Sequence, residues 1–217
     1  MAAKPIVITI ANQKGGVGKT TTVANLAASL ADSGKKILVI DCDYQANVTS
    51  LLCGDEQLKL KEKSFTYAIK HDLSIDKVSV VTRFKNLDLV PANRELDDLR
   101  EQLVGQPNQF RLVDLMLDCP QAKNYDYVLI DTHPSLDCFF QSAVAASEHY
   151  IIPLFPEADS SRGLAHQLQA AGNALQEIVE IMRDAAGKLA HRFHFLRLTE
   201  LFFRIALGAY VAADEIK

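Results

Sequence analysis

Residues 6–22 decide the fold of this chain, and they read Ile6-Val7-Ile8-Thr9-Ile10-Ala11-Asn12-Gln13-Lys14-Gly15-Gly16-Val17-Gly18-Lys19-Thr20-Thr21-Thr22. The β-branched run at 6–10 predicts a buried strand. A glycine-rich bend follows, and apolar residues at helical spacing then predict a helix from about Lys19 to Asp32: Val23, Leu26, Ala27 and Leu30. A strand, a glycine loop and a helix in this order predict a phosphate site, because glycines let the backbone approach an anion and the positive end of the helix favours its charge.

Particular side chains in this stretch suit a nucleotide. Lys19 would place a cation against the β- and γ-phosphates, and the Thr20 hydroxyl would be a magnesium ligand. The predicted nucleotide-binding residues are Lys14, Gly15, Gly16, Val17, Gly18, Lys19, Thr20 and Thr21. The alternative is an ordinary strand–turn–helix connection. The presence of the glycines, the lysine and the threonine together argues against it.

Length and composition narrow the fold and the classes of protein to which this chain can belong. The 217 residues are enough to bury a substantial core, and we expect one α/β domain over residues 1–217. A formal net charge of −4 argues against a polybasic binder, so any contact with nucleic acid must come from a local patch. The four cysteines show no CxxC spacing, which argues against a zinc site and fits a reducing cytoplasm. The first strand leaves no room for a signal peptide, and no apolar run approaches a membrane span.

Two later strands are predicted to end in aspartates. Residues 37–40 lead into Asp41 and Asp43, and residues 125–130 lead into Asp131. The carboxyl ends of parallel strands form the ligand crevice of an open α/β sheet, so these acids are well placed for chemistry. Of Asp41 and Asp43, only one is expected to face the nucleotide. An apolar strand ending in aspartate is the Walker B arrangement, in which the carboxylate holds magnesium directly or through water. The alternative is solvated acids at strand ends.

Several segments carry a family resemblance. The loop has Gln13 where the common P-loop pattern has glycine, and a second lysine, Lys14, opens it. This string resembles the deviant Walker A box of the ParA/MinD superfamily, and residues 11–22 resemble the ParA branch, which partitions DNA. Residues 41–47 resemble the family's DxDPQGN box, with Tyr44 for proline and Ala46 for glycine. Residues 87–93 resemble its LDLIPAN segment, and residues 131–136 resemble its DTPPSL switch, with His133 for the first proline.

The resemblance implies an α/β fold of the P-loop NTPase type, with three layers and a mostly parallel twisted sheet flanked by helices. It implies ATP and Mg²⁺ as cofactors and weak intrinsic ATP hydrolysis. Lys19 would be catalytic, Asp43 would orient the attacking water, and Lys14 would reach the phosphates of a partner subunit. Thr20 and Asp131 would be the metal ligands. The implied partners are a second copy of the chain in an ATP-dependent homodimer, nonspecific DNA and a ParB-like centromere-binding stimulator. A membrane is not among them, and the protein would be cytoplasmic and associated with the nucleoid.

The remaining elements are predicted from local patterns. We expect a short helix around Phe65, a helix capped by Asn93, helices over 108–117, 139–146 and 160–185, and strands over 150–154 and 193–199. From about residue 183 the resemblance fades, so this part is divergent or truncated. Basic residues gather there: Arg183, Lys188, Arg192, Arg197 and Arg204. They are either a DNA contact or a solvated helix face. His133 is either a catalytic base or a packing residue.

Other functions compete with DNA partitioning. A MinD-like positioning ATPase would need an amphipathic, lysine-rich C-terminal helix, and the tail over 210–217 has no such character. An iron-protein reductase would need cluster cysteines. Cys138 has a suitable spacing from Asp131, but Cys119 is too close to the Walker B strand to be the second ligand. A nucleotide-binding paralogue with little turnover also stays open.

Overall fold

The structure, a computed structural model, describes residues 4–53, 62–103, 115 and 124–153. By its internal contacts the chain divides into two compact units, residues 1–153 and 154–217, and the described residues all belong to the first. The predicted helix over 160–185, the strand over 193–199 and the basic residues from 183 to 204 lie outside the described residues. Most of the predicted helix over 108–117 does so as well. A single domain over 1–217 stays a prediction.

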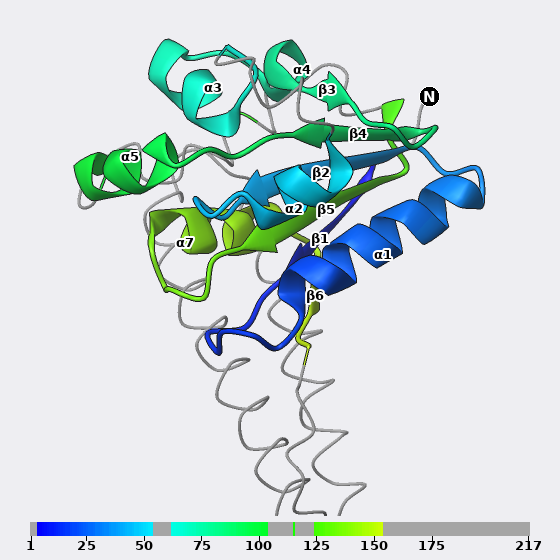
Figure 1. The fold of residues 1–217 in the computed structure, drawn as a ribbon, viewed down its shortest axis with the longest axis horizontal. Helices are drawn as coiled ribbons and strands as arrows, with labels where there is room; N and C mark the ends of the chain where they lie inside the picture. Colours follow the sequence, from blue (N-terminus) through cyan, green and yellow to red (C-terminus); the bar gives the residue numbers. More distant parts are fainter. Residues whose placement is uncertain (1–3, 54–61, 104–114, 116–123, 154–217) are drawn as a thin grey trace, which may run out of the picture. The chain divides into compact units, whose positions relative to one another are not determined.

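A six-stranded sheet forms the centre of the described unit (Figure 1). The strands are β1 (Ile6–Ile10), β2 (Ile37–Cys42), β3 (Val80–Val81), β4 (Leu87–Val90), β5 (Tyr127–Thr132) and β6 (His149–Ile151). Their order is β3-β4-β2-β5-β1-β6. Every pairing is parallel except the one between β3 and β4 at the edge. The predicted mostly parallel sheet is therefore confirmed.

Helices cover both faces of this sheet (Figure 1). They are α1 (Lys19–Asp32), α2 (Asn47–Leu52), α3 (Phe65–His71), α4 (Ile75–Val78), α5 (Glu95–Leu103) and α7 (Cys138–Ala146). Successive side chains of a strand point to opposite faces, so the odd residues of β2 pack with α1 and α2, and its even residues pack with α3, α5 and α7. Two buried apolar clusters result, one on each face, and the three-layer fold is confirmed.

Element boundaries agree closely with the sequence in some places. Helix α1 has the predicted bounds. Helix α7 begins at Cys138, one residue earlier than expected, because the Asp137 carboxylate accepts hydrogen bonds from the backbone of Phe139 and Phe140. Strand β6 ends at Ile151, so the predicted strand over 150–154 was placed too far along the chain.

Two local predictions were wrong or incomplete. Asn93 does not cap α5 with its side chain. Its Oδ1 accepts from the Thr66 hydroxyl at 2.8 Å, its Nδ2 donates to the Ser64 hydroxyl at 3.4 Å, and α5 begins at Glu95. The region around Phe65 holds α3 and α4, followed by the two-residue strand β3. A strand this short leaves no alternation in the sequence to recognise.

None of the described helices combines the length and the apolar character that crossing a bilayer would require.

Candidate nucleotide site

The loop between β1 and α1 owes its shape to its glycines. Gly16 and Gly18 have φ angles of 74° and 90°, in the left-handed region that residues with a Cβ rarely adopt. A Cβ added at Gly15, Gly16 or Gly18 would meet no atom within 4 Å. The space over the loop is therefore open, and the positive φ angles at Gly16 and Gly18 are what favour glycine there. Val17 is buried and anchors the loop, while residues 13–16 are exposed.

Lys19 is the first residue of α1, and its side chain lies against the loop. Its residue surface is only 7% exposed, and its Nζ donates to the Lys14 carbonyl at 3.3 Å. Burial lowers the pKa of the Lys19 ammonium, while the nearby charges of Asp131 and Asp43 raise it. The structure therefore brings together the predicted lysine and the two predicted carboxylates.

Thr20 and Asp131, the predicted metal ligands, are in direct contact. The Thr20 hydroxyl donates to Oδ2 of Asp131 at 2.9 Å. Asp131 is fully buried, and within the described residues its Oδ1 has no hydrogen-bond partner. Burial and the Asp43 charge raise the pKa of the Asp131 carboxyl to about 7, against the lowering effects of Thr20 and Lys19.

This pair of oxygens fits a magnesium ion. Mg²⁺ prefers oxygen ligands and is usually held by one or two protein groups together with phosphate oxygens and water. Within the described part of the chain no group of three or more His, Cys, Asp and Glu residues could hold a metal. A site of protein side chains alone is thus not present there. The buried, unpaired oxygen of Asp131 next to the Thr20 hydroxyl is the arrangement that a cation bridging to phosphate would complete.

Asp41 and Asp131 lie side by side because of the sheet register. The parallel pairing of β2 with β5 sets Asp41 opposite Asp131. Asp41 is fully buried. Burial and the neighbouring Asp131 raise the pKa of Asp41 to about 8, against the lowering effect of its hydrogen bonds to Thr49 and to the Asp43 backbone. Two neighbouring buried carboxylates favour protonation or a nearby positive charge.

Asp43 begins the loop after β2 and is 5% exposed. Its Oδ1 accepts from the Gln45 backbone at 2.8 Å, and its carbonyl accepts from the Ala46 backbone at 2.8 Å. Its charge acts on both Lys19 and Asp131. Ala46 has a φ of 54°, the left-handed conformation that the glycine of the family's box would adopt without strain.

Lys14 and Thr21 are both exposed. The Lys14 backbone donates to Oδ1 of Asn12 at 2.9 Å, and Nδ2 of Asn12 donates to the Pro153 carbonyl at 2.8 Å. Asn12 thus ties the start of the loop to the segment after β6, a role that no sequence pattern had indicated. Contact of Lys14 with a partner subunit stays a prediction, and so does the nucleotide contact of Thr21.

Comparisons with known proteins agree with this geometry. The sequence model of a family described as an AAA domain, AAA_31, matches residues 6–182. The chromosome partitioning protein ParA of Myxococcus xanthus is 36% identical over 200 residues, which cover 86% of this chain and 68% of that protein. This chain belongs to the ParA family of partitioning ATPases. Against another relative, the uncharacterized protein Rv1708 of Mycobacterium tuberculosis, it is 39% identical over 159 residues; these are 73% of this chain but only about half, 49%, of that protein.

Solved structures of two similar proteins share this fold, and one of them holds a nucleotide and magnesium. Cobyrinic acid a,c-diamide synthase from Mycobacterium smegmatis, bound to ADP and magnesium, is 31% identical with a TM-score of 0.64, over 79% of this chain and 69% of that one. A plasmid partition protein from Borrelia burgdorferi is 33% identical with a TM-score of 0.61, over 76% of this chain and 71% of that one. The predicted P-loop ATPase fold is confirmed, and the ligands of the first structure support ATP and Mg²⁺ as cofactors.

Two alternatives from the sequence can be compared with the ParA-family site. The His133 ring packs on Tyr44 with centroids 4.5 Å apart, and its Nδ1 shares a hydrogen bond of 3.0 Å with the Ser135 hydroxyl, which favours a packing role. Cys138 is buried at the start of α7, and burial together with the Asp137 charge raises the pKa of its thiol to about 11. A buried thiol of this kind is a poor cluster ligand, because ligation requires the thiolate.

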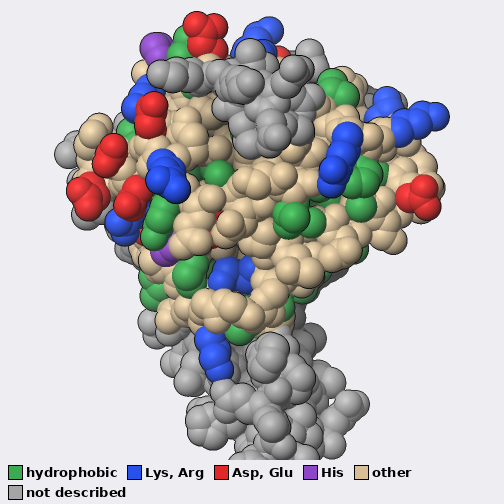
Figure 2. Space-filling model, viewed as in Figure 1, with side chains coloured by type: hydrophobic (Ala, Val, Ile, Leu, Met, Phe, Trp, Pro, Cys, Tyr) green, Lys and Arg blue, Asp and Glu red, His purple; other side chains and the backbone are tan. Residues whose placement is uncertain are grey.

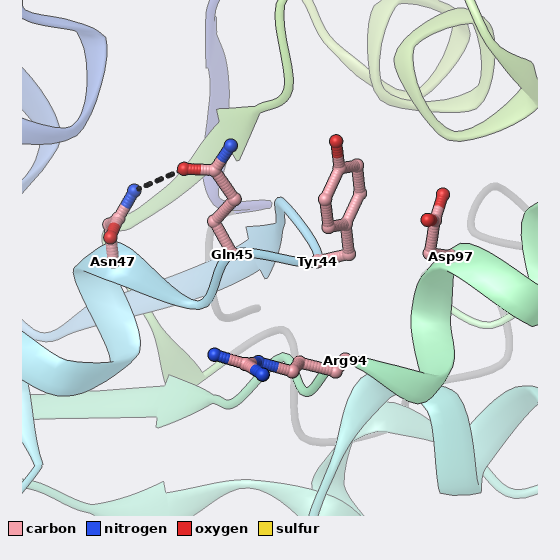
Figure 3. A pocket seen from close by; sticks show the side chains of 5 residues that line it. All are labelled: Tyr44, Gln45, Asn47, Arg94 and Asp97. Atoms are coloured by element: carbon pink, nitrogen blue, oxygen red, sulfur yellow. Dashed lines mark hydrogen bonds between the residues drawn. The ribbon is translucent and has the colours of Figure 1, made fainter.

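A cavity of about 500 Å³ lies beside the loop that follows β2 and begins at Asp43. Its lining comes from that loop, from the first residue of α2 and from the start of α5: Tyr44, Gln45, Asn47, Arg94 and Asp97 (Figure 3). The Arg94 side chain extends toward the loop, and the Asn47 amide donates to Oε1 of Gln45 at 3.3 Å. None of the predicted nucleotide-binding residues lines this cavity.

The surface gives no sign of a broad basic face on the side shown in Figure 2. Lys and Arg side chains of the described residues are spread over it, and acidic side chains lie among those near α5. An even distribution of this kind does not favour a polyanion. A DNA contact of the ParA type would then have to come from elsewhere on the chain.

Proposed function

We propose that this chain is a ParA-type ATPase that closes into a homodimer when it binds ATP and Mg²⁺. The dimer binds DNA nonspecifically, and slow hydrolysis releases it. Hydrolysis is stimulated by a ParB-like protein bound to a centromere-like site, and the cycle moves a plasmid or a chromosome. The observation that carries the proposal is the meeting of Lys19, the Thr20–Asp131 pair and Asp43 at the carboxyl edge of one parallel sheet.

Each residue of this group has a distinct task. Lys19 binds the phosphates and stabilises the charge that develops on them. Thr20 and Asp131 would hold Mg²⁺, which when bound supplies positive charge to the phosphate oxygens. Asp43 orients the attacking water and accepts its proton. Backbone amides of the loop from Gly16 to Thr20 hold the phosphates.

Lys14 acts on the nucleotide of the other subunit. It is exposed on the loop that opens the site, so a second copy facing this edge would meet its ammonium. A positive charge supplied from a partner stabilises a phosphoryl transition state in the manner of an arginine finger. Dimerisation and turnover would then be coupled.

DNA binding is assigned to the basic residues between 183 and 204, which lie outside the described residues. The described residues on the face in Figure 2 show no broad basic patch, so the proposal does not place the contact on that face. Binding to DNA would also give the protein its association with the nucleoid. A MinD-like cycle on a membrane is the competing proposal, and a regulatory paralogue with little turnover is another.

The deciding experiment measures binding to nonspecific DNA with ATP–Mg²⁺, with ADP–Mg²⁺ and without nucleotide, over a salt series. Binding should require ATP and fall steeply with salt, because phosphate contacts release counterions. Asp43→Ala should hydrolyse ATP slower by roughly 10²-fold and remain on DNA longer, since a positioned base contributes about that factor.

The matched control is Asp32→Ala, which removes an exposed carboxylate at the far end of α1 and should behave as wild type. ATP-dependent pelleting with anionic liposomes in place of DNA would contradict the proposal and favour the membrane cycle. Equal turnover in Asp43→Ala and wild type would remove Asp43 from its role. Tight ATP binding without turnover, even when a stimulating partner is present, would favour the regulatory paralogue.

A further inference from the structure

The carboxylate of Asp41 holds both ends of the loop that carries Asp43. Its Oδ1 accepts from the Asp43 backbone at 3.0 Å. Its Oδ2 accepts from the Thr49 backbone at 3.0 Å and from the Thr49 hydroxyl at 2.6 Å. Asp41 and Thr49 are both fully buried, so water does not compete for these bonds. One side chain therefore sets the distance between the start of the loop and the first turns of α2.

Thr49 extends this connection to the neighbouring strand. Its hydroxyl donates to Asp41 and at the same time accepts from the Ala92 backbone at 3.0 Å. Ala92 follows β4, and the chain runs from there through Arg94 into α5. The loop after β2 and the start of α5 face each other across the cavity of Figure 3. The Thr49 hydroxyl thus links α2 to the segment that leads from β4 into α5.

The loop needs such support, because its own residues do not favour its shape. Ala46 occupies the left-handed region with a φ of 54°, which is unfavourable for a residue with a Cβ. The Asp43 carboxylate bonds to the Gln45 backbone, which shapes one turn but does not reach the end of the loop. The three hydrogen bonds that the buried Asp41 side chain accepts hold this strained loop in place from outside it.

We propose that Asp41 and Thr49 are positioning residues that fix Asp43 for hydrolysis without touching the nucleotide. Asp41 fixes the backbone of Asp43, and Thr49 fixes Asp41 and anchors the assembly to the segment after β4. A displacement of the segment between β4 and α5 would thus move the backbone of Asp43, through Thr49 and Asp41. The inference rests on the proposed ATPase function and assigns two further residues to it.

The test compares Thr49→Val, which removes the hydroxyl and keeps the shape, with Thr49→Ser, which keeps the hydroxyl. Thr49→Val should lower kcat for ATP about tenfold or more, because a small misplacement of a reacting group is costly. Its KM and its affinity for a fluorescent ATP analogue should stay within about threefold of wild type, since the P-loop sets binding. Thr49→Ser should stay within about threefold of wild type in all three quantities.

A second readout does not depend on catalysis. Hydrogen exchange of the Asp43 and Thr49 amides should be about tenfold faster or more in Thr49→Val than in Thr49→Ser, because both amides donate to Asp41. Exchange in α1 should be unchanged. If Thr49→Val does not fold, Asp41→Asn gives the same measurements with one acceptor replaced by an amide.

The outcomes separate this inference from the proposed function. Equal kcat and equal exchange in Thr49→Val and Thr49→Ser would overturn the positioning role. Parallel losses of kcat and of ATP affinity in both variants would also overturn it, because they would show general damage to the site. If wild type does not hydrolyse ATP, the proposed function fails. The exchange comparison then decides alone: faster exchange in Thr49→Val supports the hold on the loop, and unchanged exchange overturns it.

Discussion

Two loops meet at the carboxyl edge of the sheet, and they keep their shapes by different means. The P-loop after β1 takes its left-handed turns at Gly16 and Gly18, where no Cβ opposes them. The loop after β2 takes its left-handed turn at Ala46 and is held by hydrogen bonds from outside itself, through Asp41 and Thr49. The conformation of the first loop follows from its own glycines. The second depends on partners elsewhere in the chain.

This difference predicts that variants in the two loops affect nucleotide affinity and ATP hydrolysis to different extents. A change in the P-loop removes groups that bind phosphate, so its main effect should be a lower affinity for nucleotide. A change in the hydrogen bonds that hold the second loop leaves the P-loop intact and should lower the rate of ATP hydrolysis. Binding and hydrolysis are thus separable by mutation in this fold.

The largest expected effect comes from Lys19→Ala. Loss of this ammonium removes the cation beside Asp131 and Asp43, so ATP hydrolysis should fall by roughly 10²-fold or more, with ATP binding weakened or lost. Steady-state ATPase assays and titration with a fluorescent ATP analogue measure the two effects. Lys35→Ala, at an exposed position past the end of α1, is the control and should match wild type. Normal turnover in Lys19→Ala would contradict the assignment of the whole site.

Lys14→Ala should separate nucleotide binding from dimerisation within the P-loop. Because its side chain is proposed to serve the other subunit, the variant should bind ADP within about threefold of wild type, while ATP-dependent dimerisation and turnover fall about tenfold or more. Light scattering with ATP and with ADP gives the oligomeric state. A variant that still dimerises and hydrolyses ATP normally would exclude the role in trans. Lys36→Ala, another exposed lysine, is a matched control.

The paired carboxylates behind both loops predict a pH dependence. The pKa of Asp131 is raised to about 7 and that of Asp41 to about 8, so the folded chain binds more protons than the unfolded chain above about pH 4. The free energy of unfolding without nucleotide should therefore fall as the pH rises from about 4 to about 8, the interval between the pKa values of these carboxyls in the unfolded and the folded chain.

Asp131→Asn tests the origin of this loss. The variant should show a flatter dependence of the free energy of unfolding on pH, and at pH 8 it should be more stable than wild type without nucleotide. Urea unfolding at several pH values measures both. An unchanged slope in Asp131→Asn would assign the loss to other groups, such as Asp41.

The smallest effects come from the backbone itself. Gly16→Ala should cost about 1 kcal/mol of unfolding free energy, because its φ of 74° strains any residue with a Cβ while the space around it is open. Ala46→Gly should change stability by less than about 1 kcal/mol, since relief of the strain is offset by greater freedom of the unfolded chain. Urea unfolding of the two variants gives the comparison. A larger loss in Ala46→Gly than in Gly16→Ala would reverse the proposed contrast between the loops.

The sequence predicted the P-loop best because its signal is local. Glycines at fixed spacing, a lysine and a threonine imply backbone shape and chemistry together, and the bounds of α1 and the Thr20–Asp131 contact agree with that expectation. The paired position of Asp41 and Asp131 followed less directly. It depends on the order of the strands and on their register, which no single segment contains.

The contributions of Asn12 and Thr49 could not be predicted. Asn12 bonds to the Pro153 carbonyl, and Thr49 bonds to Asp41 and Ala92. Each contact joins residues that are distant in the sequence, and asparagine or threonine at such places has many possible uses. Strand β3 was missed for a different reason, since two residues cannot show a period.

The register that sets Asp41 against Asp131 also bears on how this kind of protein would evolve. Selection keeps a chain only as stable as its task requires, and stabilising changes are common where a demanding site is no longer needed. Asp41 is tied into the loop by three hydrogen bonds, whereas one oxygen of Asp131 has none among the described residues. Replacing Asp131 would therefore relieve a buried repulsion at little cost, so a gene copy released from ATP hydrolysis would gain stability by losing it. In descendants that no longer hydrolyse ATP, we expect substitutions at Asp131 before substitutions at the P-loop glycines.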